Sequence, residues 1–318
     1  MAAVSATRQP TGGTSFALRD AWPWSTFASL VVEGEELGYR GVFLPEIVGR
    51  DAFAALSGLA GVTSRLSLGT GVVPMTARAP ALTAMGAATV QERSGGRAIL
   101  GLGTGRPRPG ALGELESQVR TIREMLDRAV RGESDHSTLA LGERVPIWIA
   151  ALGPRAISLA GRIADGVLLN WCSPGRVAEA KAAIVDAASS AGRDPRSVIV
   201  AAYIRAAADG HGARRALAAA AAEYASYPAY RRQFESMGVG AAAAALSSAR
   251  ASDEDVPPDV AAPLVDAVCL PGDTGSARAR LQVYRDAGCD LPVVYPVPHG
   301  ADGAASVANT LRLCAPDA

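Results

Sequence analysis

Short apolar runs recur along the chain, and segments with helical signals separate most of them. Because these runs lack the alternation of a half-exposed strand, they are typical of strands buried on both faces of a parallel sheet. They lie at residues 15–18, 41–44, 66–69, 98–102, 147–151, 166–169, 198–204 and 292–295. Eight strands in 318 residues predict an α/β fold of the (β/α)8 TIM-barrel class.

Helix-start signals lie between the strand-like runs. Asp51 is a candidate N-cap, and Pro80 suits the first turn of a helix that follows the third run. Pro154 opens a further predicted helix, and Thr274 or Gly275 opens another. The alternation of strand and helix therefore holds along most of the chain.

One connection is longer than a barrel requires. Residues 209–291 contain Ala-rich helix formers at 216–223 and 241–249. We therefore expect a helical insertion between strands 7 and 8, over or beside the barrel mouth. Residues 1–13 are small and polar and are expected to form a loose N-terminal tail. Residues 14–318 are then expected to form one barrel domain.

Charge and hydropathy exclude several classes of partner. Lysine plus arginine and aspartate plus glutamate both total 31, and no basic stripe indicates binding to nucleic acid or to anionic membranes. No apolar run approaches the roughly 20 residues of a membrane span. Lys181 is the only lysine, which excludes Schiff-base chemistry at any other position.

The cysteines and histidines are scattered and form no metal-binding motif. They are Cys172, Cys269, Cys289 and Cys314, with His136, His211 and His299. We therefore expect no metal site. With no C-x-x-C pair and no signal peptide, a reduced cytoplasmic protein is the simplest interpretation.

Two strands end in the same tripeptide, Gly-Thr-Gly, at residues 69–71 and 103–105. A single copy would indicate no more than a tight turn, because glycine ends strands in many proteins. Two copies in successive βα units place bare backbone at the ligand-binding end of a parallel sheet. The pattern favours a flat or phosphorylated ligand, since backbone N–H groups and helix N-termini bind anions.

Two further turns carry positive charge. Gly153, Pro154 and Arg155 follow the fifth strand and open a helix, which suits a phosphate site or an ordinary βα turn. Arg106 and Arg108 follow the second Gly-Thr-Gly turn. They could hold an anionic tail or form a solvated turn.

The first two strands are followed by candidate substrate and catalytic residues. Glu46 closes the second strand, where a carboxylate could orient a ring N–H, act as a general acid or base, or pair with Arg50. Asp20, Trp22 and Trp24 follow the first strand and are candidate substrate-binding residues. We expect one of the two tryptophans to pack in the core and the other to form a wall of the site.

Four motifs, taken in order and with their spacing, give the chain a family likeness. They are GYRGVFLPE at 38–46, RLSLGTGVVPMTARAPALTA at 65–84, SGGRAILGLGTG at 94–105 and VPIWIAALGPRAISLAGRIADGVLLN at 145–170. The pattern resembles the bacterial luciferase-like superfamily, especially its coenzyme F420-dependent oxidoreductase branch. The similarity is good over residues 38–170 and looser elsewhere.

The resemblance implies a TIM barrel that binds coenzyme F420 or FMN at its C-terminal mouth. The family's ring-binding bulge would fall at residues 70–72, with a non-prolyl cis peptide at Gly71–Val72, and its phosphate turn at residues 152–154. The residues expected to bind the cofactor are Thr70, Gly71, Val72, Gly103, Thr104, Gly105, Arg106, Leu152, Gly153, Pro154 and Arg155.

Two departures from the family concern proton transfer. Many relatives carry a histidine after the acidic residue of the second strand, and here that position is Ile47. A sugar-phosphate-oxidising relative has a glutamate where this chain has Arg106. The proton could then come from Glu46, the predicted catalytic residue, or from a substrate group, or the enzyme could use hydride transfer with little acid–base help.

These features predict an F420-dependent oxidoreductase that transfers a hydride between the C5 carbon of the deazaflavin and a small organic substrate. The reaction could be reduction of an activated C=C, C=N or C=O bond, or oxidation of an alcohol. The first alternative is an FMN-dependent monooxygenase that uses reduced flavin and oxygen. The second is a barrel that has lost catalysis and binds only flavin or a partner surface. The resemblance also implies a homodimer.

Overall fold

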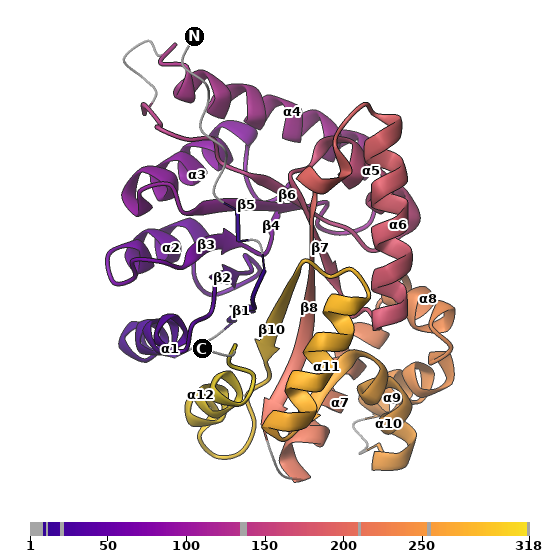
Figure 1. Cartoon of the computed structure of the whole chain (residues 1–318). Helices are drawn as coiled ribbons and strands as arrows, with labels where there is room; N and C mark the ends of the chain where they lie inside the picture. The colour runs from indigo at the N-terminus through magenta and orange to yellow at the C-terminus, as the bar shows by residue number, and fades with distance from the viewer. Residues whose placement is uncertain are drawn as a thin grey trace.

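Eight parallel strands form a closed barrel in the computed structural model, which describes residues 9–10, 12–19, 22–133, 139–208, 211–252 and 256–316 (Figure 1). Strand β10 pairs with both β1 and β8, which closes the ring. The barrel strands are β1 (Ser15–Ala17), β2 (Gly41–Leu44), β3 (Ser67–Thr70), β5 (Ala98–Gly103), β6 (Ile147–Ala150), β7 (Gly166–Asn170), β8 (Ile199–Ala208) and β10 (Leu291–Pro296). The predicted TIM barrel is confirmed.

Helices cover the outside of the barrel (Figure 1). They are α1 (Trp24–Glu36), α2 (Ala52–Ala60), α3 (Pro80–Ser94), α4 (Ala111–Val130), α5 (Pro154–Ile163), α6 (Pro174–Ser190), α11 (Thr274–Asp286) and α12 (Gly303–Leu313), with a 3-10 turn η1 (Pro195–Ser197) before β8. The helices α2, α3 and α5 begin at the residues that the sequence predicted. Asp51 caps α2 by accepting a hydrogen bond from the Ala54 N–H, and Pro80 and Pro154 occupy the first turns of their helices.

A second cluster of helices lies between β8 and β10. It comprises α7 (His211–Ala225), α8 (Pro228–Ser236), α9 (Gly240–Ser252) and α10 (Pro258–Val268), followed by the short strand β9 (Cys269–Gly272). These helices bury their own apolar core, which includes Leu217, Phe234 and Leu264. Trp171, at the end of β7, packs into the same core and so joins this helical cluster to the barrel.

The barrel interior is filled by side chains from alternate positions of the strands. Phe43 and Trp148 stack with ring centroids 5.4 Å apart, and Tyr203 belongs to the same apolar cluster. The Trp148 indole N–H donates to the Gln9 side-chain oxygen at 2.9 Å, and Pro10 is buried. Gln9 and Pro10, two residues of the predicted loose tail, therefore pack against the barrel.

The strand boundaries differ from the predicted ones mainly in β8. The sequence predicted a strand that ends at residue 204, whereas β8 continues to Ala208 because β9 pairs with its last four residues. The short strand β4 (Val73–Pro74), which pairs with β5, was also not predicted. No described helix is both long and apolar enough to cross a bilayer.

A buried carboxylate holds the entry to β3. Glu35, near the end of α1, accepts hydrogen bonds from the backbone N–H groups of Ser64, Arg65 and Leu66 at 2.7–3.1 Å. Burial raises the pKa of Glu35, but the N–H donors of Arg65, Leu66 and Ser64 together outweigh it, so the pKa lies below its ordinary value of 4.5. The ionised form therefore fixes α1 to the loop before β3.

We expect Glu35→Gln to lower the free energy of unfolding at neutral pH by about 1.5–3 kcal/mol, the size of hydrogen bonds to a charged acceptor. Because folding lowers the pKa of Glu35, its stabilisation is present above pH 4.5 and is lost as the pH falls below that value. The difference between wild type and variant should therefore narrow in acid. Urea unfolding at several pH values measures it, with Glu36→Gln, an exposed neighbour, as the control.

Candidate active site

A backbone bulge links β3 to β4 at the mouth of the barrel. The peptide bond between Gly71 and Val72 is cis, as the family resemblance predicted. The buried Tyr203 hydroxyl donates to the Gly71 carbonyl at 2.9 Å, and the Gly71 N–H donates to the Leu44 carbonyl at 2.8 Å. Burial raises the pKa of Tyr203 well above its ordinary value, so the phenol stays neutral and remains a donor. The bulge is thus held from β8 and from β2.

Thr70 and the glycine beside it lock the bulge to β5. The Thr70 hydroxyl accepts from the Gly101 N–H at 2.8 Å and donates to the Gly101 carbonyl at 2.9 Å. A Cβ added at Gly101 would lie 2.1 Å from the Thr70 carbonyl oxygen, so only glycine fits there. The Thr70 side chain is 1% exposed and makes these two hydrogen bonds. Thr70 therefore supports the bulge from within, and its hydroxyl is engaged inside the protein.

The second Gly-Thr-Gly turn continues from β5 alongside the bulge. A Cβ at Gly103 would meet the Val72 side chain at 2.8 Å, which shows how closely the two turns pack. Gly105 has a φ of +69°, which favours glycine. Thr104 is half-buried, and Arg106 is exposed.

The predicted phosphate turn lies at the N-terminus of α5. A Cβ added at Gly153 would meet no atom within 4 Å, so the space in front of this backbone is open. Arg155 is exposed in the first turn of the helix. Arg176 of α6, which the sequence analysis missed, donates to the Leu152 carbonyl at 3.3 Å. Two guanidinium groups therefore flank the turn at residues 152–155.

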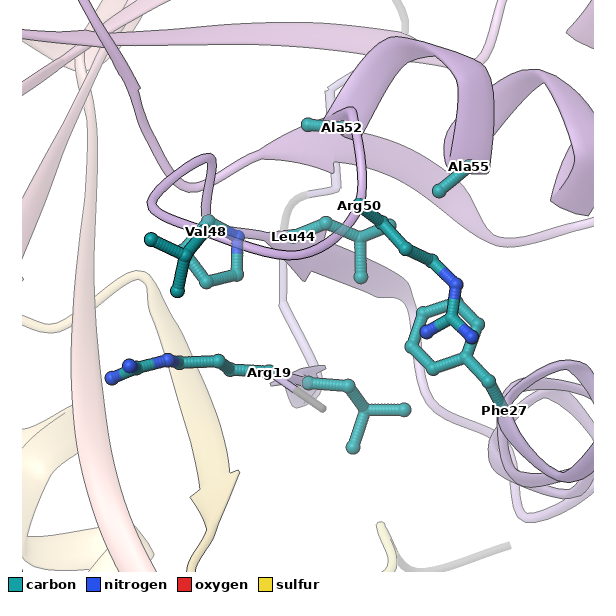
Figure 2. Close-up of a pocket in the computed structure, with 9 residues that line it drawn as sticks. Arg19, Phe27, Leu44, Val48, Arg50, Ala52 and Ala55 are labelled. Atoms are coloured by element: carbon teal, nitrogen blue, oxygen red, sulfur yellow. The ribbon is translucent and has the colours of Figure 1, made fainter. Parts of the chain in front are cut away.

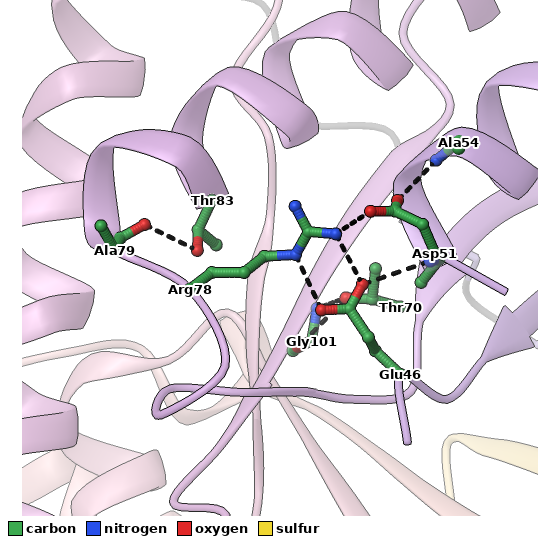
Figure 3. A network of polar contacts seen from close by, with 9 residues as sticks. Glu46, Asp51, Ala54, Thr70, Arg78, Ala79, Thr83 and Gly101 are labelled. Carbon is green, nitrogen blue, oxygen red and sulfur yellow. Dashed lines mark hydrogen bonds and ion pairs between the residues drawn. The ribbon is translucent and has the colours of Figure 1, made fainter. Parts of the chain in front are cut away.

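Glu46 lies at the mouth, but its carboxylate is fully engaged (Figure 3). Its two oxygens accept from Nε and Nη2 of Arg78 at 2.7 and 3.1 Å and from the Ala52 N–H at 3.2 Å. The partner is thus Arg78, and not Arg50 as the sequence analysis considered. Arg78 also pairs with Asp51, the N-cap of α2. This network fixes the loop between β2 and α2.

Arg50 instead packs beneath this loop. Its guanidinium lies over the Phe27 ring, 5.0 Å from the centroid, and donates to the Trp22 carbonyl. Figure 2 shows Arg50 directed toward Phe27. The hollow that these residues line has a volume of about 20 Å³, which is room for one water molecule and not for a substrate.

The three residues predicted to bind substrate have different surroundings. Trp22 is half-buried against the barrel core. Trp24 is 41% exposed and packs against Phe27, with ring centroids 5.8 Å apart. Trp24 also packs against α2, because a Cβ added at Gly58 would lie 2.7 Å from its ring. The wall position stays a prediction. Asp20 lies outside the described residues.

The sequence analysis missed Arg205, a buried charged residue in the barrel interior. Arg205 on β8 is 5% exposed, and its Nη1 donates to the Asn170 side-chain oxygen at 2.6 Å. Aromatic rings surround the guanidinium, among them those of Trp171, Tyr224 and Tyr295. The signal was present, because Tyr203 and Arg205 are polar residues two positions apart in an apolar run and so share one face. The predicted strand ended one residue too early to include Arg205.

We expect Gly71→Ala to destabilise the fold by about 1–3 kcal/mol, the usual cost of overpacking. The new Cβ would lie 1.7 Å from the Tyr203 hydroxyl oxygen and 3.1 Å from the Phe43 Cβ. Adding Tyr203→Phe should restore part of the loss by removing the oxygen. Gly113→Ala is the control, because a Cβ there meets nothing within 4 Å. Thermal unfolding measures all four proteins, and a Gly71→Ala variant as stable as wild type would contradict the packing described.

The fold has counterparts among proteins of known structure. A coenzyme F420-dependent tetrahydromethanopterin reductase from Methanopyrus kandleri superposes with a TM-score of 0.74 at 22% identity, covering 94% of this chain and 96% of that one. An F420-dependent secondary alcohol dehydrogenase gives 0.73 at 16% identity, covering 96% and 98%. The FMN-bound oxygenating constituent of a diketocamphane monooxygenase from Pseudomonas putida gives 0.66 at 14% identity, covering 96% and 97%. At these low sequence identities, the superpositions show a shared fold and nothing more.

Sequence comparison gives closer relationships over part of the chain. A 5,10-methylenetetrahydromethanopterin reductase of Methanolobus tindarius is 36% identical over 187 residues, which are 53% of this chain and 57% of the relative. The chain thus spans little more than half the length of this curated relative. The family model described as luciferase-like monooxygenase matches residues 3–291, most of the chain. The protein is therefore a member of the luciferase-like monooxygenase family.

Proposed function

We propose that the protein is an F420-dependent oxidoreductase that transfers a hydride between C5 of the deazaflavin and a small organic substrate. The observation that carries the proposal is the bulge at residues 70–72, held rigidly by Tyr203 at the mouth of the barrel. The names of the Methanopyrus reductase and of the secondary alcohol dehydrogenase, which both state F420 dependence, support F420 as the cofactor.

The bulge suits one face of a flat ring. Val72 is half-buried, so part of its apolar side chain is accessible to a ring, while Tyr203 fills the space beside Gly71. Because Tyr203 and Leu44 bond the Gly71 backbone, this surface does not need to reorganise when a ring binds. The deazaflavin would supply the redox chemistry, and the protein would supply position and a dry surface.

The turn at residues 152–155 suits the phosphate of the same cofactor. The open backbone at Gly153 allows close approach, and the N-terminus of α5 favours an anion. Arg155 would contribute one positive charge, and Arg176, which is also ion-paired with Glu179 at 2.8 Å, would contribute a second, partly neutralised one. Arg106 and the backbone of Thr104 and Gly105 remain proposed contacts on the neighbouring turn.

Glu46 is proposed to hold the loop between β2 and α2 in place and to take no part in proton transfer. Its ion pair with Arg78 and its bond to the Ala52 N–H order the loop between β2 and α2. A carboxylate with both oxygens engaged is poorly placed to exchange a proton with a substrate unless Arg78 moves away. The proton for a reduced substrate would then come from another group.

FMN is the second candidate cofactor. The diketocamphane monooxygenase structure, which contains FMN, has the same barrel over nearly the whole chain. The function would then be that of a monooxygenase using reduced flavin and oxygen. A homodimer and a cytoplasmic location also stay predictions.

We expect the purified protein to bind F420 with micromolar or tighter affinity and at least about tenfold more tightly than FMN, a difference of about 1.4 kcal/mol. Arg155→Ala and Arg176→Ala should each weaken F420 binding about fivefold, since one exposed charge contact contributes up to about 1 kcal/mol. Fluorescence titration measures both effects, with Arg196→Ala, whose side chain is 90% exposed, as the control. Preference for FMN would favour the monooxygenase, and no binding to either cofactor would refute both.

Once a substrate is known, we expect Glu46→Gln to lower kcat by less than about tenfold, because a positioning residue takes no part in proton transfer. Loss of a general acid or base typically costs about 10²–10⁴-fold. Steady-state rates against pH distinguish the two roles. A hundredfold loss of kcat at unchanged KM, with a changed pH profile, would make Glu46 the proton-transferring residue that the sequence predicted.

A further inference from the structure

Arg205 is a buried cation at the mouth of the barrel, and no carboxylate of the described residues pairs with it. It is 5% exposed, and among the described residues no aspartate or glutamate forms an ion pair with it. Its guanidinium has five N–H donors, and it makes two hydrogen bonds, to the Asn170 side-chain oxygen at 2.6 Å and to the Tyr224 hydroxyl at 3.4 Å. A buried charge without a counterion is costly, which indicates that its partner is a ligand.

Aromatic rings form the walls around this cation. The Arg205 Cζ lies 4.2 Å from the ring centroid of Tyr295, 4.7 Å from that of Trp171 and 5.3 Å from that of Tyr224. Cation–π contacts compensate part of the lost hydration, but they do not use the in-plane N–H donors. Those donors stay oriented for a planar acceptor such as a carboxylate.

Two neighbouring groups favour the same kind of ligand. The Trp171 indole N–H is buried and has no acceptor within the described part of the chain. Arg19, at the end of β1, acts electrostatically on Tyr295 and so adds a second positive charge to this side of the mouth. Figure 2 shows its side chain extending away from Phe27 and Arg50. The carboxylate of Glu223 also acts on Tyr295, but it forms no ion pair with Arg205.

The strand places this cation beside the bulge. Tyr203, which bonds the Gly71 carbonyl, and Arg205 are two residues apart on β8 and share its inner face. The rise per residue puts their backbones about 7 Å apart. That distance is comparable to the length of a conjugated ring with an attached carboxylate.

We propose that Arg205, with Asn170 and the Trp171 indole N–H, binds the carboxylate of a planar, conjugated substrate, and that the Trp171, Tyr224 and Tyr295 rings enclose its body. The substrate class rests on the proposed function, since it places the substrate's conjugated part next to the bulge. The carboxylate site itself needs no cofactor. The same oxyanion chemistry could come from the cofactor, and the experiment separates the two sources.

The test is equilibrium binding of benzoate to the full chain, followed by intrinsic tryptophan fluorescence and by calorimetry, with benzamide as the uncharged probe. We expect benzoate to bind in the millimolar range or better and benzamide at least tenfold more weakly. Arg205→Met should weaken benzoate binding at least tenfold. Arg205→Lys should weaken it less, because a lysine keeps the positive charge and loses only the paired N–H donors of the guanidinium. Arg196→Ala should bind benzoate as wild type does.

F420 affinity is measured on the same proteins. Unchanged F420 binding by Arg205→Met, together with lost benzoate binding, supports the proposal. Equal binding of benzoate and benzamide, or full benzoate binding by Arg205→Met, overturns it, as does loss of F420 binding without loss of benzoate binding. If Arg205→Met does not fold, Arg205→Lys and the exposed Arg19→Ala carry the test, and both should weaken benzoate binding. Arg205-dependent benzoate binding without binding of F420 or FMN would sustain the carboxylate site and refute the proposed function.

Discussion

The hydrogen bond from Tyr203 to the Gly71 carbonyl ties together two sides of the barrel that are far apart in sequence. One side is the bulge after β3, and the other is the inner face of β8. Tyr203 fills the space that any side chain at residue 71 would need, so glycine is the residue that fits there without displacing the phenol. The shape of the mouth therefore depends on one phenol packed across the barrel axis.

Polar groups at the mouth divide into those that are paired within the protein and those that are not. Glu46, Arg78 and Asp51 satisfy one another and fix a loop. Arg205 has an amide, a phenol and ring faces around it, and no carboxylate within the described chain. A mouth that is neutralised on the side of β2 and positive on the side of β8 would orient a substrate that carries charge at one end.

Much of the fold was predictable because its signals are local. Apolar runs gave the eight strands, and Asp51, Pro80 and Pro154 gave helix starts through capping and proline geometry. The extension of β8 was not predictable, since it depends on pairing with β9, a strand more than sixty residues later in the chain. Arg78 as the partner of Glu46 was missed for the same reason, because 32 residues separate them.

The helices α7–α10 have a hydrophobic core of their own, and they contribute Tyr224 to the surroundings of Arg205 while Gly71 and Tyr203 belong to the barrel. Part of the wall that would select a substrate, at Trp171 and Tyr224, is thus supported by a different core from the part that would hold a cofactor. Substitutions that repack the helical cluster can change one without disturbing the other. A lineage of such proteins could therefore acquire new substrates by drift in residues 211–268 while its redox chemistry stayed fixed.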